Sequence, residues 1–334
     1  MLRDGTVFED EHLPREIVGR NSQMNEVTDA LAPVEDGARA ENCFLFGPSG
    51  AGKTTVARAA VRELRRAVHG VPTAYINCWK DYTRSGVLER AAKDLAGAAV
   101  PKNVAARELI DTLQNGVDSP SVIVLDEVDQ LQDPGTLYDL HSVPGLAWIC
   151  IANREVDLLA RLDERVHSRV SVGYRVQFDR YTVDTTAEIL DRRAAEGLEP
   201  GAVDRPTLDR IAELVDGDAR QAITALRVAA RKAEREGLST IPPRLVDDAV
   251  LDAEAAVRQK TISKLNDHQR VLYECIEESG PLIQKELYEQ YEQEHPDPIT
   301  LRGLRKSHLP KLEHYNLIET ERGGDGKTYR LASG

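Results

Sequence analysis

One stretch of sequence decides the fold of the first half of this chain: Cys43-Phe44-Leu45-Phe46-Gly47-Pro48-Ser49-Gly50-Ala51-Gly52-Lys53-Thr54-Thr55. Four apolar residues typical of a buried strand lead into the pattern G-x-x-x-x-G-K-[ST], and an amphipathic helical pattern follows. The glycines let backbone N–H groups surround phosphate oxygens, and the N-terminus of the next helix favours their negative charge. We therefore expect residues 47–55 to bind a nucleotide, with Lys53 on the β- and γ-phosphates and Thr54 on Mg²⁺. The alternative, a glycine-rich turn with an incidental lysine, does not explain both flanking elements.

A second motif ends a strand in two carboxylates. The run 122–125 is wholly apolar, as in a buried parallel strand, and Asp126 and Glu127 follow it. The carboxyl ends of such strands are where α/β sheets bind ligands. There Asp126 would hold the Mg²⁺ through water, and Glu127 would polarise the attacking water. A strand that ends in an ordinary helix cap looks the same in isolation, but the phosphate loop favours a site that hydrolyses a nucleotide.

The first half of the chain alternates strand and helix patterns, which predicts a parallel α/β sheet. Its expected strands cover residues 42–46, 73–78, 122–125, 146–152 and 174–178. From about residue 179 only helical patterns rich in alanine remain, which predicts a small helical domain. We expect three domains: a nucleotide-binding base at 1–178, a helical lid at 179–255 and a C-terminal domain at 256–334.

The C-terminal domain combines helices with a hairpin. Helical patterns at 267–278 and 284–294 precede a basic segment, and two short β patterns then flank Gly-Gly-Asp-Gly. This order predicts a winged helix-turn-helix. Pro310 lies inside the basic segment, where it removes a helical hydrogen bond, so we expect it to kink or split the recognition helix.

Further polar residues are candidates for the same nucleotide site. Asn153 ends the strand 146–152, where its amide could orient the hydrolytic water, although a capping asparagine is the alternative. Arg165 and Arg169 lie one helical turn apart, and a surface helix with acidic neighbours explains them equally well. Arg220 is expected in the first turn of a helix, where a cation opposes the helix dipole. That unfavourable placement points to a contact with phosphate.

The order of these features resembles an AAA+ ATPase. With a C-terminal winged helix, the chain resembles the archaeal origin-recognition/cell-division-control family of replication initiators over nearly its whole length. The resemblance begins at residues 13–20, Leu-Pro-Arg-Glu-Ile-Val-Gly-Arg, which are similar to the family's entry box against the adenine. It implies that Val18 and Arg20 bind ATP and that Asn153 and Arg220 are the two sensor residues. It further implies an arginine finger, presented to ATP on a neighbouring subunit, at Arg169 or else at Arg165.

The same resemblance implies a helical insertion that touches DNA. Residues 80–118 are long enough to contain it. An ordinary surface helix would look the same. Its candidate DNA contacts are Tyr82, Thr83, Arg84, Arg90 and Lys93.

Acidic residues outnumber basic ones by 56 to 43, a formal charge of −13. Taken alone, this balance argues against a general binder of nucleic acids or anionic membranes. The strip 299–330 differs, because it holds seven basic and four acidic residues. Six of these cations are candidate DNA contacts on the recognition segment and the wing: Arg302, Arg305, Lys306, Lys311, Arg322 and Lys327. A winged helix that binds only proteins is the alternative. If DNA binds, few phosphate contacts predict a shallow dependence of affinity on salt.

The sequence as a whole predicts a cytoplasmic protein. No apolar run approaches the roughly 18 residues of a membrane-spanning helix, and the four cysteines lack metal or redox spacing. The expected function is an ATP-dependent replication initiator that binds origin DNA, hydrolyses ATP slowly as a switch and helps load the replicative helicase. It would act alone, with further copies of itself or with paralogues. Two alternatives are another AAA+ DNA motor, of clamp-loader or branch-migration type, and a regulatory signalling NTPase. Arg220 argues against the signalling class.

Overall fold

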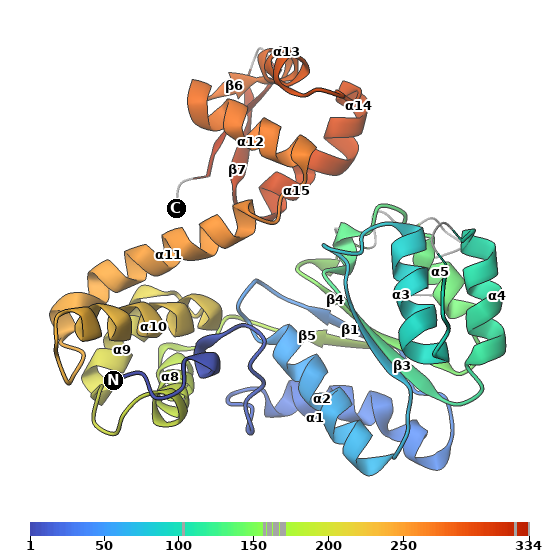
Figure 1. The fold of residues 1–334 in the computed structure, drawn as a ribbon, viewed down its shortest axis with the longest axis horizontal. Coiled ribbons are helices and arrows are strands. Elements are labelled where there is room, and N and C mark those ends of the chain that lie inside the picture. Colours follow the sequence, from blue (N-terminus) through green and yellow to red (C-terminus); the bar gives the residue numbers. More distant parts are fainter. Residues whose placement is uncertain are drawn as a thin grey trace. The chain divides into compact units, whose positions relative to one another are not determined.

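The computed structural model of this protein describes residues 1–101, 104–155, 158, 162, 167, 172–323 and 326–332. The chain forms two compact units, Met1–Val250 and Leu251–Gly334 (Figure 1). A finer division of the first unit near residue 178 stays a prediction. Among the described residues, every helix is too short or too polar to span a bilayer.

A parallel sheet forms the centre of the first unit, as predicted. Within the described residues its order is β2-β3-β4-β1-β5, and all four pairings are parallel. The strands are β1 (Cys43–Phe46), β2 (Thr73–Asn77), β3 (Ser121–Asp126), β4 (Leu146–Ala152) and β5 (Tyr174–Gln177). Their bounds lie within one residue of the predicted ones.

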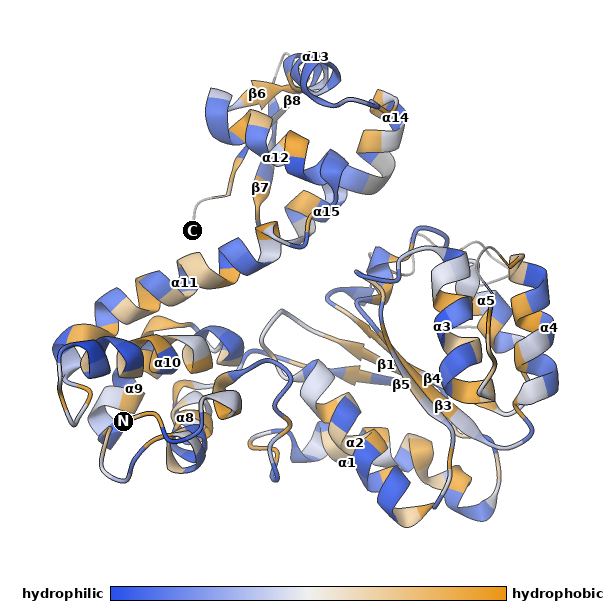
Figure 2. Ribbon diagram, viewed as in Figure 1, coloured by the Kyte–Doolittle hydropathy of each residue, from blue (hydrophilic) through white to orange (hydrophobic). Residues whose placement is uncertain are grey.

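Helices cover both faces of this sheet, which explains why β3 and β4 are apolar without interruption. Val122 and Val124 pack on the side of α1 and α2, whereas Ile123 and Leu125 pack on the side of α3 and α4. Figure 2 shows the hydrophobic colour along these strands. The helices of this part are α1 (Asn21–Leu31), α2 (Lys53–Ala67), α3 (Arg84–Ala96), α4 (Ala106–Gly116) and α5 (Thr136–His141), with the short turns η2 (Ala32–Asp36) and η3 (Val128–Gln130).

The remainder of the first unit is helical, in agreement with the predicted lid. It comprises α8 (Val183–Gly197), α9 (Arg205–Leu214), α10 (Ala219–Arg235), η4 (Pro243–Leu245) and the start of α11 (Val246–Ile262). Thr182, Asp204 and Asp218 cap α8, α9 and α10, because each side chain accepts a hydrogen bond from a backbone N–H of the first turn. These caps set the start of each lid helix.

The N-terminal segment completes the lid core. Its turn η1 (Gly5–Phe8) buries Val7 and Phe8. Phe8 packs on Gly197 at the end of α8, where a Cβ would lie 2.4 Å from its ring. The segment therefore belongs to the lid, although it is far from the lid helices in sequence.

The second unit has the elements expected of a winged helix. These are α12 (Asp267–Ser279), β6 (Leu282–Ile283), α13 (Gln284–Glu294), a recognition segment, β7 (Ile318–Gly323) and β8 (Gly326–Leu331). The strands form an antiparallel sheet in the order β6-β8-β7. The hairpin β7–β8 was predicted, whereas the two-residue strand β6 was not.

Pro310 interrupts the recognition segment, as predicted. The segment consists of α14 (Leu301–Gly303), a π-helical turn η5 (Leu304–His308) and α15 (Leu309–His314). Pro310 stands in the first turn of α15, where backbone N–H groups lack partners within the helix in any case. A π turn precedes it, and the Leu309 N–H donates to the Leu304 carbonyl at its end.

Candidate active site

The phosphate loop lies between β1 and α2, and its glycines are required by what packs on them. Gly50 has a φ of 73°, and a Cβ there would lie 2.1 Å from Asp218 Oδ1. Gly52 has a φ of 87°, and its Cβ would lie 2.2 Å from Tyr181 Oη. Only glycine tolerates both the left-handed backbone and this approach of the lid.

Lys53 is at the centre of the site. It is 7% exposed, and its ammonium donates to the carbonyls of Gly47 and Pro48 and, over 3.1 Å, to Asn153 Oδ1. Burial lowers the pKa of Lys53 to about 8, although Asp126 opposes this shift. Asn153 thus lies beside the predicted phosphate-binding lysine.

One oxygen of Asp126 accepts hydrogen bonds from two hydroxyl groups. Thr54 Oγ1 donates to Asp126 Oδ2 over 2.9 Å, and Tyr75 Oη donates to the same oxygen over 2.6 Å. Asp126 is 5% exposed, so its carboxylate is screened from bulk water. The two residues predicted to hold Mg²⁺, Thr54 and Asp126, are therefore in direct contact.

Glu127 follows in a strained conformation. Its φ of 57° and ψ of 44° place it in the left-handed region, which residues other than glycine seldom adopt. Such backbone strain concentrates at functional sites. The turn directs the chain away from β3 immediately after the two carboxylates.

The sheet topology explains why residues so distant in sequence meet. Since β4 pairs with both β1 and β3, the carboxyl ends of three strands lie side by side. The Gly47 N–H donates to the Asn153 carbonyl over 3.2 Å, which joins the phosphate loop to the end of β4. The predicted convergence of Lys53, Asp126 and Asn153 is present.

The lid and the entry segment also reach the phosphate loop. Arg220 donates to Ser49 Oγ over 3.4 Å, and the Ala219 N–H donates to the Gly50 carbonyl over 3.3 Å. Arg20 is 6% exposed, donates to the Ala51 carbonyl over 3.0 Å and stacks on Tyr181 with its guanidinium carbon 3.9 Å from the ring centre. Both arginines thus contact the phosphate loop, and their predicted contacts with the nucleotide stay predictions.

Other sequence predictions have mixed outcomes. Val18 is half-buried beside Gly19, whereas Arg165 and Arg169 lie outside the described residues. In the segment predicted to touch DNA, Arg84 forms a bidentate pair with Asp139, at 2.6 and 2.9 Å, and Arg90 pairs with Asp94. Thr83 caps α3. These contacts favour a structural explanation for these three residues.

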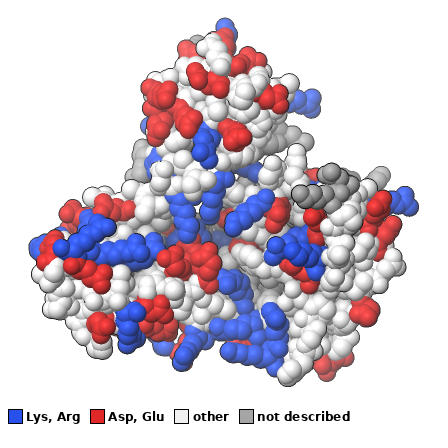
Figure 3. All heavy atoms as spheres, viewed as in Figure 1, with Lys and Arg blue, Asp and Glu red and all other residues white. Residues whose placement is uncertain are grey.

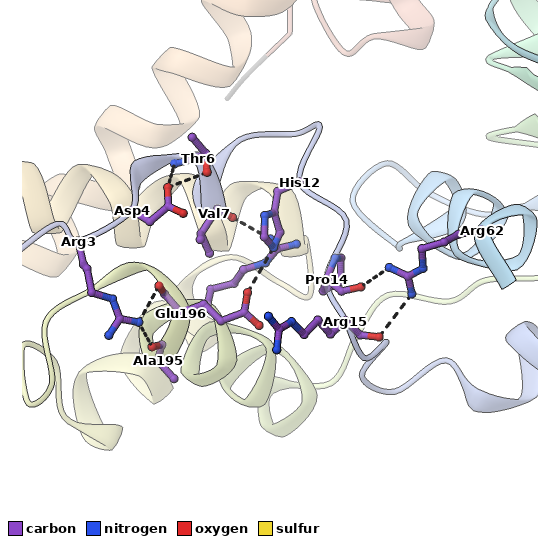
Figure 4. A network of polar contacts seen from close by, with 11 residues as sticks. Arg3, Asp4, Thr6, Val7, His12, Pro14, Arg15, Arg62, Ala195 and Glu196 are labelled. Carbon is purple, nitrogen blue, oxygen red and sulfur yellow. Dashed lines mark hydrogen bonds and ion pairs between the residues drawn. The ribbon is translucent and has the colours of Figure 1, made fainter. Parts of the chain in front are cut away.

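Sequence reasoning missed several contacts of the site. Tyr75 and Tyr181 reach it from β2 and from the connection to the lid, and no motif marks either of them. The N-terminal segment is a third case: Figure 4 shows it between helix α8 of the lid and helix α2. The residues that make its contacts are scattered along the sequence and form no motif, so only the folded chain reveals these contacts.

The N-terminal contacts connect the two parts of the first unit. Arg3 donates to the carbonyls of Ala195 and Glu196 in α8, over 2.7 and 2.9 Å. Further along the same segment, Arg62 of α2 donates to the Pro14 carbonyl over 2.9 Å. A change in the distance between lid and base must therefore strain this segment or break its hydrogen bonds.

The six candidate DNA contacts of the recognition segment and the wing lie on the second unit. Arg302, Arg305 and Arg322 are exposed, Lys311 and Lys327 are half-buried, and the side chain of Lys306 lies outside the description. Arg322 and Lys327 face each other across the hairpin. Arg330 differs, because it pairs with Glu319 and Glu321 at 2.7 and 3.0 Å. The face of this unit seen in Figure 3 carries mostly Asp and Glu around α12 and α13.

The fold and the site define a phosphate-loop ATPase of the AAA+ class. The profile of the AAA ATPase domain matches residues 16–149, and that of the Cdc6 AAA+ ATPase-type lid domain matches residues 187–250.

Relatives specify the family. The chain is 39% identical to ORC1-type DNA replication protein 9 of Halobacterium salinarum, over 99% of this chain and 94% of that protein. It is 36% identical to ORC1-type DNA replication protein 1 of the same organism, over 91% of this chain and all of that protein. The solved structure of the Aeropyrum pernix ORC1 protein in complex with DNA superposes with a TM-score of 0.78 at 26% identity, covering 99% of this chain and 93% of that one. The chain belongs to the family of ORC1-type DNA replication proteins, and it is an AAA+ ATPase of the replication-initiator type.

Proposed function

We propose that this initiator binds double-stranded origin DNA through its second unit and that ATP, held between lid and base, controls this binding. The observation that carries the proposal is the convergence on one loop of Lys53 and Asn153 from the base and Arg220 from the lid. Because the loop contacts both parts, a nucleotide there can favour one arrangement of the lid over another.

The donor set fits Mg²⁺. A threonine hydroxyl and a carboxylate are the oxygen ligands that this hard cation takes alongside nucleotide phosphates, and Thr54 and Asp126 supply them side by side. When bound, Mg²⁺ neutralises charge that develops on the phosphates. Thr54 would hold it directly and Asp126 through water.

The remaining residues have roles that follow from their positions. Lys53 would stabilise negative charge on the β- and γ-phosphates, and Glu127 would polarise the attacking water, which Asn153 orients. Arg220 would contact the γ-phosphate from the lid. Arg169 or Arg165 would reach the nucleotide of a neighbouring subunit. Slow hydrolysis would then act as a switch rather than as a motor stroke.

The DNA-binding part of the proposal depends on exposed cations. Arg302 and Arg305 on the recognition segment and Arg322 on the wing are exposed, as groove and phosphate contacts require. An ORC1 relative of this chain has been solved with DNA. We further propose that the bound protein works in the cytoplasm, with other copies or paralogues, to help load the replicative helicase.

Fluorescence anisotropy with a labelled origin duplex tests this function. We expect the full chain to bind an origin duplex more tightly than a scrambled duplex, and the two affinities to change when ATP replaces ADP. The Lys53→Ala variant should lose the effect of ATP and keep a basal affinity for DNA. Absence of DNA binding at every salt concentration, or identical binding with ATP and ADP, would contradict the proposal.

A further inference from the structure

Tyr75 has no part in the roles assigned above, yet its hydroxyl lies in the site. Its oxygen is 2.6 Å from Asp126 Oδ2, a short distance for a hydrogen bond from a hydroxyl to a carboxylate. Thr54 Oγ1 donates to this same oxygen. The three side chains form one chain of contacts that runs from the edge strand β2 to the start of α2.

The register of the sheet explains how Tyr75 reaches the carboxylate. Tyr75 pairs with Val124 and Asn77 pairs with Asp126, so these four side chains point to the same face. Tyr75 and Asp126 are diagonal neighbours on adjacent strands, about 8 Å apart at Cα. A serine or threonine hydroxyl at position 75 would be too short, whereas the phenol spans the diagonal.

The surroundings favour a donor role over core packing. The residue is 39% exposed on an edge strand, so its ring does not fill the sheet interior. A carboxylate has no hydrogen to donate, so the phenol hydroxyl is the donor in this 2.6 Å contact.

We propose that Tyr75 is a positioning residue for the Mg²⁺ site. By donating to Asp126 Oδ2, it holds the carboxylate in the orientation that also accepts the Thr54 hydroxyl hydrogen. That bond turns the lone pairs of Thr54 Oγ1 toward the metal. Partners of metal ligands act in this way in other sites, and their removal typically weakens metal binding by about 10–100-fold. This inference rests on the proposed function, which assigns Thr54 and Asp126 to Mg²⁺.

The test removes one oxygen atom. Tyr75→Phe deletes the donor and keeps the ring. Tyr174→Phe is the matched control, because Tyr174 is also 39% exposed and lies on β5, the opposite edge of the same sheet. Binding of a fluorescent ADP analogue to the full chain is measured in EDTA and at increasing Mg²⁺ concentration. Thermal unfolding of all three proteins is measured in parallel, and we expect the two variants to melt at closely similar temperatures.

We expect the three proteins to bind the analogue equally in EDTA, because Tyr75 acts only through the metal ligands. The Mg²⁺ concentration for half-maximal effect should be about 10-fold higher for Tyr75→Phe and unchanged for Tyr174→Phe. An equal Mg²⁺ requirement in Tyr75→Phe and the unaltered protein would overturn the role of Tyr75 alone. If Mg²⁺ has no effect on the unaltered protein, the Mg²⁺ assignment of the proposed function fails, and this inference fails with it.

Discussion

The nucleotide site and the recognition segment place their polar side chains in opposite surroundings, one buried and the other exposed. In the nucleotide site Lys53 and Asp126 are more than nine-tenths buried, and their partners include Asn153, which follows β4, and Thr54 of α2. On the recognition segment Arg302 and Arg305 are exposed, and the backbone that carries them changes from an α-helix to a π-helix.

This difference has a physical reason. A phosphate that is held in a low-dielectric site needs donors already in place, because rearranging them would cost free energy at each binding event. Cations that meet DNA in a groove need access to solvent and freedom to adjust. Single substitutions in the nucleotide site should therefore reduce ATP hydrolysis strongly. Single substitutions in the recognition segment should reduce DNA affinity by smaller factors.

The largest effect is expected at Lys53. Lys53→Ala removes the ammonium that joins the phosphate loop to Asn153, and ATP hydrolysis should fall by about 100-fold or more. Release of inorganic phosphate is the measurement. Lys80→Ala, at an exposed lysine of the same unit, is the control and should hydrolyse ATP normally. Unchanged hydrolysis in Lys53→Ala would remove this lysine from the site.

The exposed arginines should show a smaller effect on DNA affinity. We expect Arg302→Ala and Arg305→Ala each to weaken binding to an origin duplex by about tenfold, since one groove or phosphate contact contributes about 1–3 kcal/mol. Arg330→Ala is the matched control, because this guanidinium is already paired with Glu319 and Glu321. Anisotropy titrations at several salt concentrations provide the affinities. An equal loss for all three variants would point to net charge as the cause.

Two glycine variants can separate the effect of the contact between lid and phosphate loop from the effect of a strained backbone. Gly50→Ala and Gly37→Ala place a Cβ at the same φ, 73° and 74°, but only position 50 has an obstacle, the Asp218 carboxylate. Both variants should lose about 1–2 kcal/mol of stability from the left-handed backbone. Only Gly50→Ala should also weaken ATP binding, by about tenfold, because the lid must move away from the loop. Calorimetry measures the ATP affinity of both variants, and thermal unfolding measures their stability. Equal ATP affinities of the two variants would argue against a role for the contact.

The smallest effect is a pH dependence of the recognition segment. Burial lowers the pKa of His308 to about 4, with contributions from His268, Lys311 and His295, and burial likewise lowers the pKa of His268. Asp267 and Asp297 face the same cluster and oppose the shift at His268. Between pH 6.5 and 4 the unfolded chain then binds protons that the folded unit resists, so stability falls as the pH decreases through this window.

Hydrogen exchange in the full chain can detect this change locally. Protection of residues 301–315, corrected for the intrinsic effect of pH on exchange, should decrease from pH 6.5 to pH 4.5, and His308→Gln should reduce that decrease. His69→Gln, at an exposed histidine of the first unit, serves as the control and should leave it unchanged. A His308→Gln variant with the original pH dependence would shift the explanation to His268 and its neighbours.

Much of the nucleotide site could be predicted because its parts are local patterns joined by one topological rule. The phosphate loop, the Asp126–Glu127 pair and Asn153 each end or follow a strand, and parallel strands align their carboxyl ends. Tyr75 and Tyr181 could not be predicted in this way, because no pattern in their neighbours signals a contact across strands or from the lid. Arg84 is a different case, since its sequence position suggests DNA and the folded chain pairs it with Asp139, so its DNA contact stays a prediction.

The sequence by itself determined which strands form the parallel sheet, where their bounds lie and which chemistry the phosphate loop carries, because strand periods and the glycine–lysine pattern are local properties. It also determined that Pro310 interrupts the recognition segment, since proline acts through its own missing N–H. Only the tertiary structure decided which side chain supports each of those groups. Tyr75 on Asp126, Asp218 on Gly50 and the N-terminal segment on the lid are contacts between residues 51 to 192 positions apart, and packing rather than local propensity brings them together.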